Sequence, residues 1–123
     1  MRVWLPVTEQ AFEQFFETGS IQCDLGFAVT PDWEQLQSDS DLDVLEDDIL
    51  YEAGQSGAGH RVVLVADVAS EVLGQVPGQV LPGPLTRRDL QAVFARGDVD
   101  DQFSWFGPTE SLSVLEFLGI AAH

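Results

Sequence analysis

The chain has 123 residues, 45% of them hydrophobic and 10% aromatic, and its 21 acidic residues outnumber its five arginines to give a net charge of −16. This length and apolar content exclude a disordered chain and predict one globular domain that spans residues 1–123 and has its own core. The charge disfavours direct binding to nucleic acid, the short apolar runs disfavour a membrane span, and the acidic N-terminal segment disfavours a signal peptide.

The first part of the chain predicts two strands and two helix starts. Residues 2–7 are apolar and β-branched, as in a buried strand, and Thr8 is placed to cap a helix that Gly19 ends. A second strand is predicted within residues 21–30, and Pro31 after a capping threonine marks the next helix start. The core-facing side of the first helix carries Ala11, Phe12, Phe15 and Phe16.

The segment from residue 41 to residue 53 predicts a helix with an acidic outer face. Ser40 and Asp43 offer a capping box at its start, and a loop of small residues, 54–59, follows it. Helical spacing directs one apolar stripe toward the core, made of Leu42, Leu45, Ile49 and Ala53. The same spacing leaves Val44 and Tyr51 exposed between two acidic ridges. One ridge consists of Asp43 and Asp47, and the other of Asp41, Asp48 and Glu52.

The strongest strand signal follows this helix. Residues 61–68 form a near-continuous apolar run, which predicts a central strand covered on both faces of the sheet. Another strand is predicted within residues 71–80, and Pro82 and Pro84 confine its end to an edge or a turn.

The last part of the chain begins with a capping box formed by Thr86 and Asp89. Residues 91–96 fit either a continuation of the helix that this box opens or a strand. Three further elements are predicted, namely an acidic turn at 98–101, a strand at 103–106 and a helix at 109–118. Because helices alternate with strands, the sequence predicts an α/β or α+β fold, a single-domain sandwich of a mixed β-sheet with packed helices.

Four segments of the chain also resemble a known family. They are Arg2-Val3-Trp4-Leu5-Pro6, Ala28-Val29-Thr30, residues 61–68, and Trp105-Phe106 with Thr109-Glu110. Together they resemble a group of short actinobacterial proteins that form a domain of unknown function. The resemblance implies a bacterial cytoplasmic protein of mixed α/β fold, with a strand in the stretch that matches residues 90–96. It implies no catalytic residue, ligand or partner.

No motif in the chain identifies a reaction, a cofactor or a metal site. The run 39–43 imitates half of a calcium-binding loop, but Val44 and Leu50 occupy the positions that need glycine and glutamate. Cys23 and His60 form a nucleophile and base only if the fold brings them together, and the plainer interpretation is a small strand residue and a loop residue. A single cysteine allows no intrachain disulfide and favours a reducing, cytoplasmic compartment.

The acidic bias is the remaining functional signal. Because an apolar spot ringed by charge is typical of protein interfaces, the sequence favours a non-catalytic interaction module that binds a basic protein partner. A small enzyme of unrecognised type and a nucleic-acid-mimicking inhibitor are the alternatives, and association of identical chains stays open. A GC-rich coding sequence or adaptation to high salt would also explain the bias. The candidate interaction surface comprises Asp41, Asp43, Val44, Asp47, Asp48, Tyr51 and Glu52.

Overall fold

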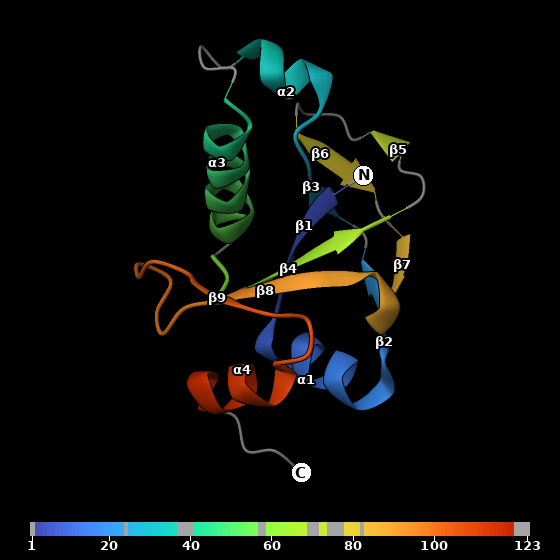
Figure 1. Ribbon diagram of the computed structural model, residues 1–123, viewed down its shortest axis with the longest axis vertical. Coiled ribbons are helices and arrows are strands. Elements are labelled where there is room, and N and C mark those ends of the chain that lie inside the picture. Colours follow the sequence, from blue (N-terminus) through green and yellow to red (C-terminus); the bar gives the residue numbers. More distant parts are fainter. Residues whose placement is uncertain are drawn as a thin grey trace.

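The computed structural model describes residues 2–23, 25–36, 41–56, 59–68, 72–73, 78–81 and 83–119 (Figure 1). The helices are α1 (Glu9–Thr18), α2 (Pro31–Leu36), α3 (Leu42–Gln55) and α4 (Ser111–Leu118), with a short 3-10 turn, η1 (Arg87–Asp89). The strands of the first half are β1 (Arg2–Val7), β2 (Ser20–Cys23), β3 (Gly26–Phe27) and β4 (Val62–Asp67). Those of the second half are β5 (Val72–Leu73), β6 (Gln79–Leu81), β7 (Gly83–Thr86), β8 (Leu90–Ala95) and β9 (Ser104–Phe106).

The strands form one large sheet and one small ribbon. Seven strands follow the order β5-β6-β3-β1-β4-β8-β9, and β2 pairs separately with β7. Every pairing among these strands is antiparallel. The expected fold of a β-sheet with packed helices is therefore confirmed in its α+β form, whereas the expected mixture of parallel and antiparallel pairing is not found among the described strands.

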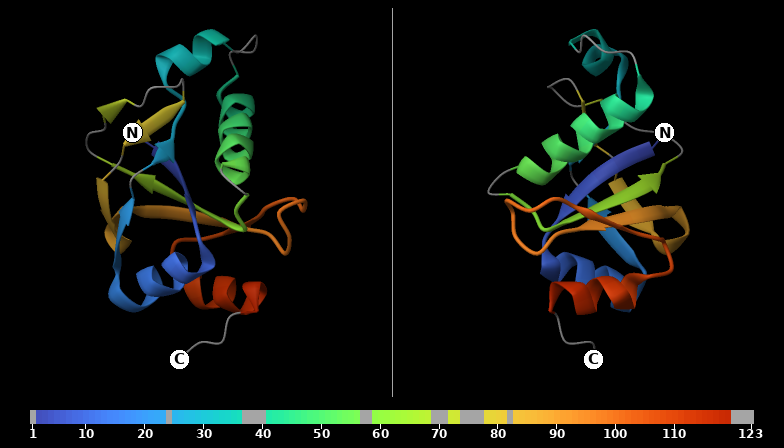
Figure 2. Two further views of the ribbon diagram at one scale, coloured as in Figure 1. Left: turned by 180° about the vertical axis from the view of Figure 1, so that it is seen from behind. Right: turned by 60° about the vertical axis from the view of Figure 1, so that its left-hand side comes forward.

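The helices cover both faces of the large sheet. Figure 2 shows α1 and α4 together on one face and α3 on the other. Side chains alternate along a strand, so Val3 and Leu5 of β1 pack with Phe12 and Phe15 of α1, whereas Trp4 packs with the cluster under α3. In β4, each residue from position 62 to position 66 is at most 4% exposed. The predicted central strand, covered on both faces, is confirmed.

Helix α1 follows its sequence signals closely. The Thr8 hydroxyl accepts a hydrogen bond from the Ala11 N–H at 3.0 Å, and Gly19 ends the helix at a φ of 80°, in the left-handed region that glycine tolerates. Phe12 and Phe15 are buried and Phe16 packs at the edge of the same cluster. Burying each of the first two rings contributes about 2–3 kcal/mol to folding, which fixes α1 against the sheet.

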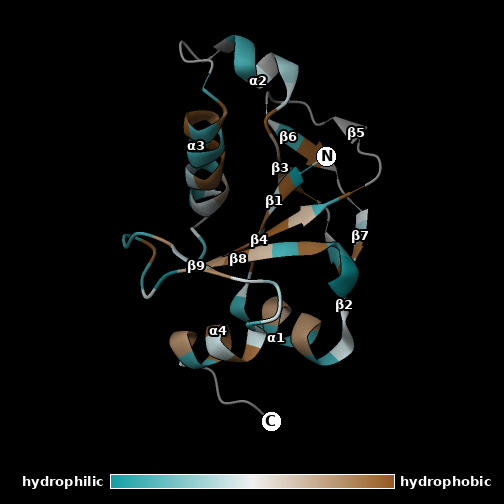
Figure 3. Ribbon diagram, in the orientation of Figure 1, coloured by the Kyte–Doolittle hydropathy of each residue, from teal (hydrophilic) through white to brown (hydrophobic). Residues whose placement is uncertain are grey.

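Helix α3 begins and packs slightly differently from the prediction. Its N-cap is Asp41, whose carboxylate accepts from the Asp43 N–H at 3.0 Å, and Ser40 lies outside the described residues. In Figure 3 the helix shows bands of both hydrophobic and hydrophilic colour, as an amphipathic helix should. Three of the four predicted core residues are buried, but Leu42 is 57% exposed. That expectation is wrong because Leu42 opens the helix, so no preceding turn covers it.

Two stretches expected as single strands each contain two short ones. Residues 21–30 divide into β2 and β3, which belong to different sheets, and residues 71–80 contain β5 and the start of β6, with 74–77 outside the described residues. Pro84 lies in β7, which pairs with β2 in the small ribbon, and Pro82 is also outside the described residues. Pro84 thus lies in the two-stranded ribbon, whereas Pro6 lies within the central strand β1, opposite Val63 of β4. Beside Pro6, β1 has no register partner among the described residues of β3, in agreement with the missing N–H donor of proline.

The capping box at residues 86–89 exists, but it opens only a single turn. The Asp89 carboxylate accepts from the Thr86 N–H at 3.0 Å, and the chain then enters β8 rather than an α-helix. Strand β8 pairs with β4 over most of its length, with Val93 opposite Leu64 and Ala95 opposite Val62. Of the two conformations that the sequence allows for residues 91–96, the structure shows the strand, up to Ala95. The strand forms because β8 pairs with β4 on one side and with β9 on the other.

Candidate functional site

The seven residues of the candidate interaction surface lie on α3 and its N-cap. Val44 is 39% exposed and Tyr51 is 59% exposed, as the helical spacing predicts. Asp48 is half-buried, and the other four carboxylates are exposed. All seven residues therefore belong to one helix and its cap, but only some of them border the hollows beside that helix.

One side of α3 borders a hollow above strands β8 and β9. This hollow has a volume of about 360 Å³, and Asp43, Glu46 and Asp47 line it from the helix. Its opposite wall includes Phe94 of β8 and Trp105 of β9. The Trp105 indole is 61% exposed, which is unusual for a tryptophan and leaves a large aromatic surface free at the edge of the sheet.

A second hollow of about 760 Å³ continues along the same side of α3. Its far wall is the loop after β8, which contributes Asp100, Asp101 and Phe103. Asp47 and Leu50 line both hollows. The two hollows therefore adjoin at Asp47 and Leu50, and together they are called here the α3 groove. Carboxylates line it from α3 in both hollows and from the loop after β8 in the second.

Two arginines already make contacts within the α3 groove. Arg2 Nη1 lies 3.3 Å from Glu46 Oε2 at one end, and the Arg96 guanidinium lies 4.2 Å from the centre of the Phe103 ring at the other. Phe103 in turn meets Phe94 edge to face, with 6.4 Å between ring centres. Both walls of the groove thus accept guanidinium groups in the native fold, through a carboxylate and through an aromatic face.

Arg96 also holds the groove together. It is 4% exposed, and it donates hydrogen bonds to the carbonyl oxygens of His60 at 2.8 Å and Gly54 at 2.9 Å. Burial lowers the pKa of Arg96, and the charges of Asp100, Asp101 and Asp98 oppose that shift. The pKa of arginine starts so high that the side chain stays charged, and it ties the end of α3 to the loop of the opposite wall.

The acidic face of α1 lies elsewhere. Helix α1 packs on the opposite face of the sheet from α3 (Figure 2), and its Glu9 pairs with Arg61 at 2.6 Å. The same Arg61 donates to the Leu118 carbonyl at 3.2 Å, so it joins α1 to the end of α4. The acids of α1 and of α3 do not share one surface, and this arrangement does not favour a single phosphate-like row.

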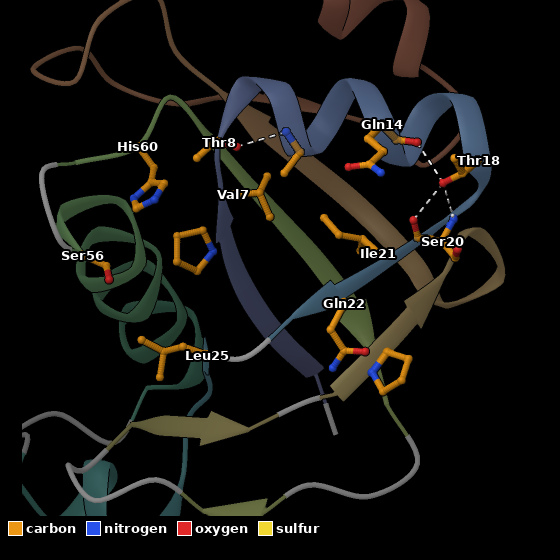
Figure 4. Close-up of a pocket in the computed structure, with 13 residues that line it drawn as sticks. Val7, Thr8, Gln14, Thr18, Ser20, Ile21, Gln22, Leu25, Ser56 and His60 are labelled. Carbon is orange, nitrogen blue, oxygen red and sulfur yellow. Dashed lines mark hydrogen bonds between the residues drawn. The ribbon is translucent and has the colours of Figure 1, made fainter.

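A third hollow opens beside β1 and β2, beyond the end of α3. It has a volume of about 770 Å³ and is called here the β1–β2 cavity. In Figure 4, His60 and Ser56 stand on one side of it, and Gln14, Thr18 and Ser20 stand on the other. The full lining is Pro6, Val7, Thr8, Ala11, Gln14, Thr18, Ser20, Ile21, Gln22, Leu25, Ser56, His60 and Pro84.

His60 is the titratable side chain among those that line the β1–β2 cavity. Burial lowers its pKa, the positive charge of Arg96 adds to the shift, and the Ser56 backbone offsets part of it. Its Nδ1 is buried and has no hydrogen-bond partner of acceptable geometry in the described structure. The Cys23 side chain lies outside the described residues, so the pairing of Cys23 with His60 stays untested. A second group for acid–base chemistry is not found among the described lining residues.

Metal and membrane signals are equally sparse in the part of the chain that the structure describes. There, His, Cys, Asp and Glu side chains form no group of three or more that could hold a metal ion. None of the helices in these described ranges combines the length and apolarity of a membrane span.

Comparison with known sequences gives a family match for the chain. Residues 1–104 match the sequence model of a family of unknown function, DUF6912. The chain belongs to this family. The match includes α3 and the loop that forms the opposite wall of the groove, and it ends at Ser104, one residue before Trp105. Comparisons with curated proteins and with solved structures give no match.

Family membership confirms the resemblance to a domain of unknown function, while actinobacterial origin and cytoplasmic location stay predictions. The sequence identified three of the groove residues in advance, namely Asp43, Asp47 and Tyr51. Asp41, Val44, Asp48 and Glu52 do not line the groove. Sequence reasoning missed its other wall because the acidic turn and Trp105 are distant from α3 in the chain.

Proposed function

We propose that the protein is a non-catalytic interaction module whose α3 groove binds a basic segment of a partner protein. The observation that supports this most strongly is the groove itself, where carboxylates on two walls flank the exposed rings of Tyr51 and Trp105. Arginine and lysine side chains are attracted both to carboxylates and to aromatic faces. Aromatic anchors inside a charged rim are a recurrent design of specific interfaces.

Arginine suits this groove better than lysine. A guanidinium can pair with a carboxylate through two parallel hydrogen bonds and can stack on an aromatic ring, whereas an ammonium is a compact point charge. The contacts that Arg2 makes with Glu46, and Arg96 with Phe103, are intramolecular examples of these two modes. A partner segment with spaced arginines would repeat them along Asp43, Asp47 and the loop acids.

The remaining acids of α3 have a different role in this proposal. Asp41, Asp48 and Glu52 lie off the groove, so they contribute long-range attraction rather than contacts. Such attraction raises association rates and weakens with salt. The proposed contact surface is therefore shifted from the middle of the outer face, at Val44, toward the side of α3 that faces β9.

Affinity capture with paired charge reversals tests the proposal. The groove variant carries Asp43→Arg and Asp47→Arg, and the control carries Glu17→Arg and Glu116→Arg on α1 and α4. Both variants change the net charge equally. We expect wild type and control to retain the same stoichiometric partner through a basic segment, and the groove variant to lose it. If both variants lost the partner, binding would depend on net charge alone. If both variants retained the partner, the interface would lie outside the groove.

A further inference from the structure

We infer that the β1–β2 cavity is a second binding site, which takes an uncharged small molecule bearing hydroxyl or amide groups. This cavity shares no lining residue with the α3 groove, so the inference is independent of the proposed partner. Its volume of about 770 Å³ lies within the ~300–1,000 Å³ typical of small-molecule sites.

The lining is uncharged in a chain where charge is abundant. Not one of the 13 described lining residues is Asp, Glu or Arg, although the chain carries 21 acids and five arginines. Burial lowers the pKa of His60, which favours the uncharged form of its imidazole. An anion would meet no counter-charge among these described lining residues, and it would be repelled by a strongly negative protein. A cation would find no carboxylate among them and many carboxylates elsewhere on the described surface.

The cavity offers polar groups that the fold does not use. The hydroxyls of Thr8 and Thr18 already form hydrogen bonds with nearby backbone groups. Thr8 accepts from the Ala11 N–H at the cap of α1, and Thr18 donates to the carbonyls of Gln14 and Ser20. The side chains of Gln14, Gln22 and Ser56, in contrast, have no hydrogen-bond partner within the described structure. Each amide side chain brings a donor and an acceptor, which is the complement of a neutral hydroxyl- or amide-bearing ligand.

Unpaired strand edges add backbone groups to the same space. Among the described strands, β1 pairs with β3 at Trp4 and not at Pro6 or Val7, and β2 pairs with β7 but not with β1. Pro6 and Pro84 both line the cavity, and proline, which lacks an N–H donor, blocks the addition of a further strand. A compact small molecule therefore fits this gap better than an extended peptide.

Apolar side chains complete the walls. Val7, Ile21 and Leu25 lie among the polar groups and can cover the carbon skeleton of a ligand (Figure 4). Sugars and nucleosides share the required chemistry, since both combine several hydroxyl groups with less polar surfaces. The two sources are separated by the choice of probe.

Matched pairs of neutral and charged probes test the inference. N-acetylglucosamine is compared with glucosamine, which is cationic, and adenosine is compared with AMP, which is anionic. Binding is followed by the shifts of the Gln14 and Gln22 side-chain amide signals in 1H–15N NMR spectra. We expect saturable shifts with at least one neutral probe, and at least tenfold weaker binding of its charged counterpart.

A filling variant and a matched control complete the test. Gln22→Trp should abolish the shifts by occupying the cavity, while Gln35→Trp, an exposed substitution on α2, should leave them unchanged. The wild-type titration alone remains decisive if Gln22→Trp does not fold. Absence of saturable shifts with both neutral probes, equal binding of charged counterparts, or shifts that persist in folded Gln22→Trp would each overturn the inference. The groove variant Asp43→Arg with Asp47→Arg should bind these probes normally, which separates this site from the proposed partner site.

Discussion

Replacing Arg96 with methionine should destabilise the protein strongly, because this side chain fastens the end of α3 to the opposite wall of the groove. Methionine retains the apolar stem but removes the guanidinium donors that lie 2.9 Å from the Gly54 carbonyl and 2.8 Å from the His60 carbonyl, and the Gly54 carbonyl then keeps the His60 N–H as a donor. Hydrogen bonds to a charged group contribute about 1.5–3 kcal/mol each, so we expect a loss of about 4 kcal/mol. With an unfolding entropy of about 2.1 cal/mol/K per residue, that loss lowers the melting temperature by about 15 °C.

The control for this prediction is Arg88→Met, which changes the net charge equally at an exposed position of η1. Thermal and urea unfolding, followed by circular dichroism, should show a shift of less than about 0.5 kcal/mol for the control. If Arg96→Met and Arg88→Met shifted the melting temperature equally, the bridging role of Arg96 would be refuted. The small change would then reflect only the loss of one positive charge.

Three further predictions concern the same fold. The melting temperature should rise as sodium chloride goes from about 10 to about 500 mM, because salt screens the repulsion among the acidic side chains. A rise that continues into the molar range would indicate a protein from a high-salt habitat, and an unchanged melting temperature would show that nearby arginines already offset the acidic charge. Gly54→Ala should lower the free energy of unfolding in urea by about 1–3 kcal/mol, since the added Cβ would lie 2.7 Å from the Phe103 ring. A higher free energy of unfolding, as alanine gives at an open helix position, would contradict this packing. Burial lowers the pKa of His60, so as pH falls His60 takes up a proton more readily in the unfolded chain than in the folded protein. The wild-type protein should therefore lose stability relative to His60→Gln as pH falls through about 6.5. Parallel profiles of stability against pH for the two proteins would argue against burial of the ring.

Local signals in the sequence were sufficient for some elements and not for others. Thr8 and Gly19 bound α1 as predicted, because a cap and a left-handed stop act within one turn of the chain. The run in β4 was identified as central because its side chains are apolar on both faces. The capping box of Thr86 and Asp89 was also identified, but the continuation into β8 depends on pairing with β4, which is distant in sequence.

The functional surfaces divide in the same way. Helical spacing indicates that Asp43, Asp47 and Tyr51 lie on the outer side of α3, since that periodicity is local. It cannot indicate that Trp105 and the loop acids lie across from them, because β8 and β9 bring that wall into place by long-range pairing. The β1–β2 cavity was missed for the same reason, as its described lining comes from three separate stretches of the chain, 6–25, 56–60 and Pro84.

The central claim, that the α3 groove recognises basic segments, is tested most directly by titrating the protein with an arginine octapeptide and mapping the 1H–15N shifts. At about 150 mM salt, where attraction between distant exposed charges is largely screened, the shifts should concentrate on Asp47, Tyr51 and the Trp105 indole. The Trp105→Ala variant should bind at least several-fold more weakly, since it removes an exposed aromatic anchor. Shifts of equal size at Glu17 on α1, with no loss of affinity in Trp105→Ala, would show general attraction to an acidic protein and would contradict a specific groove.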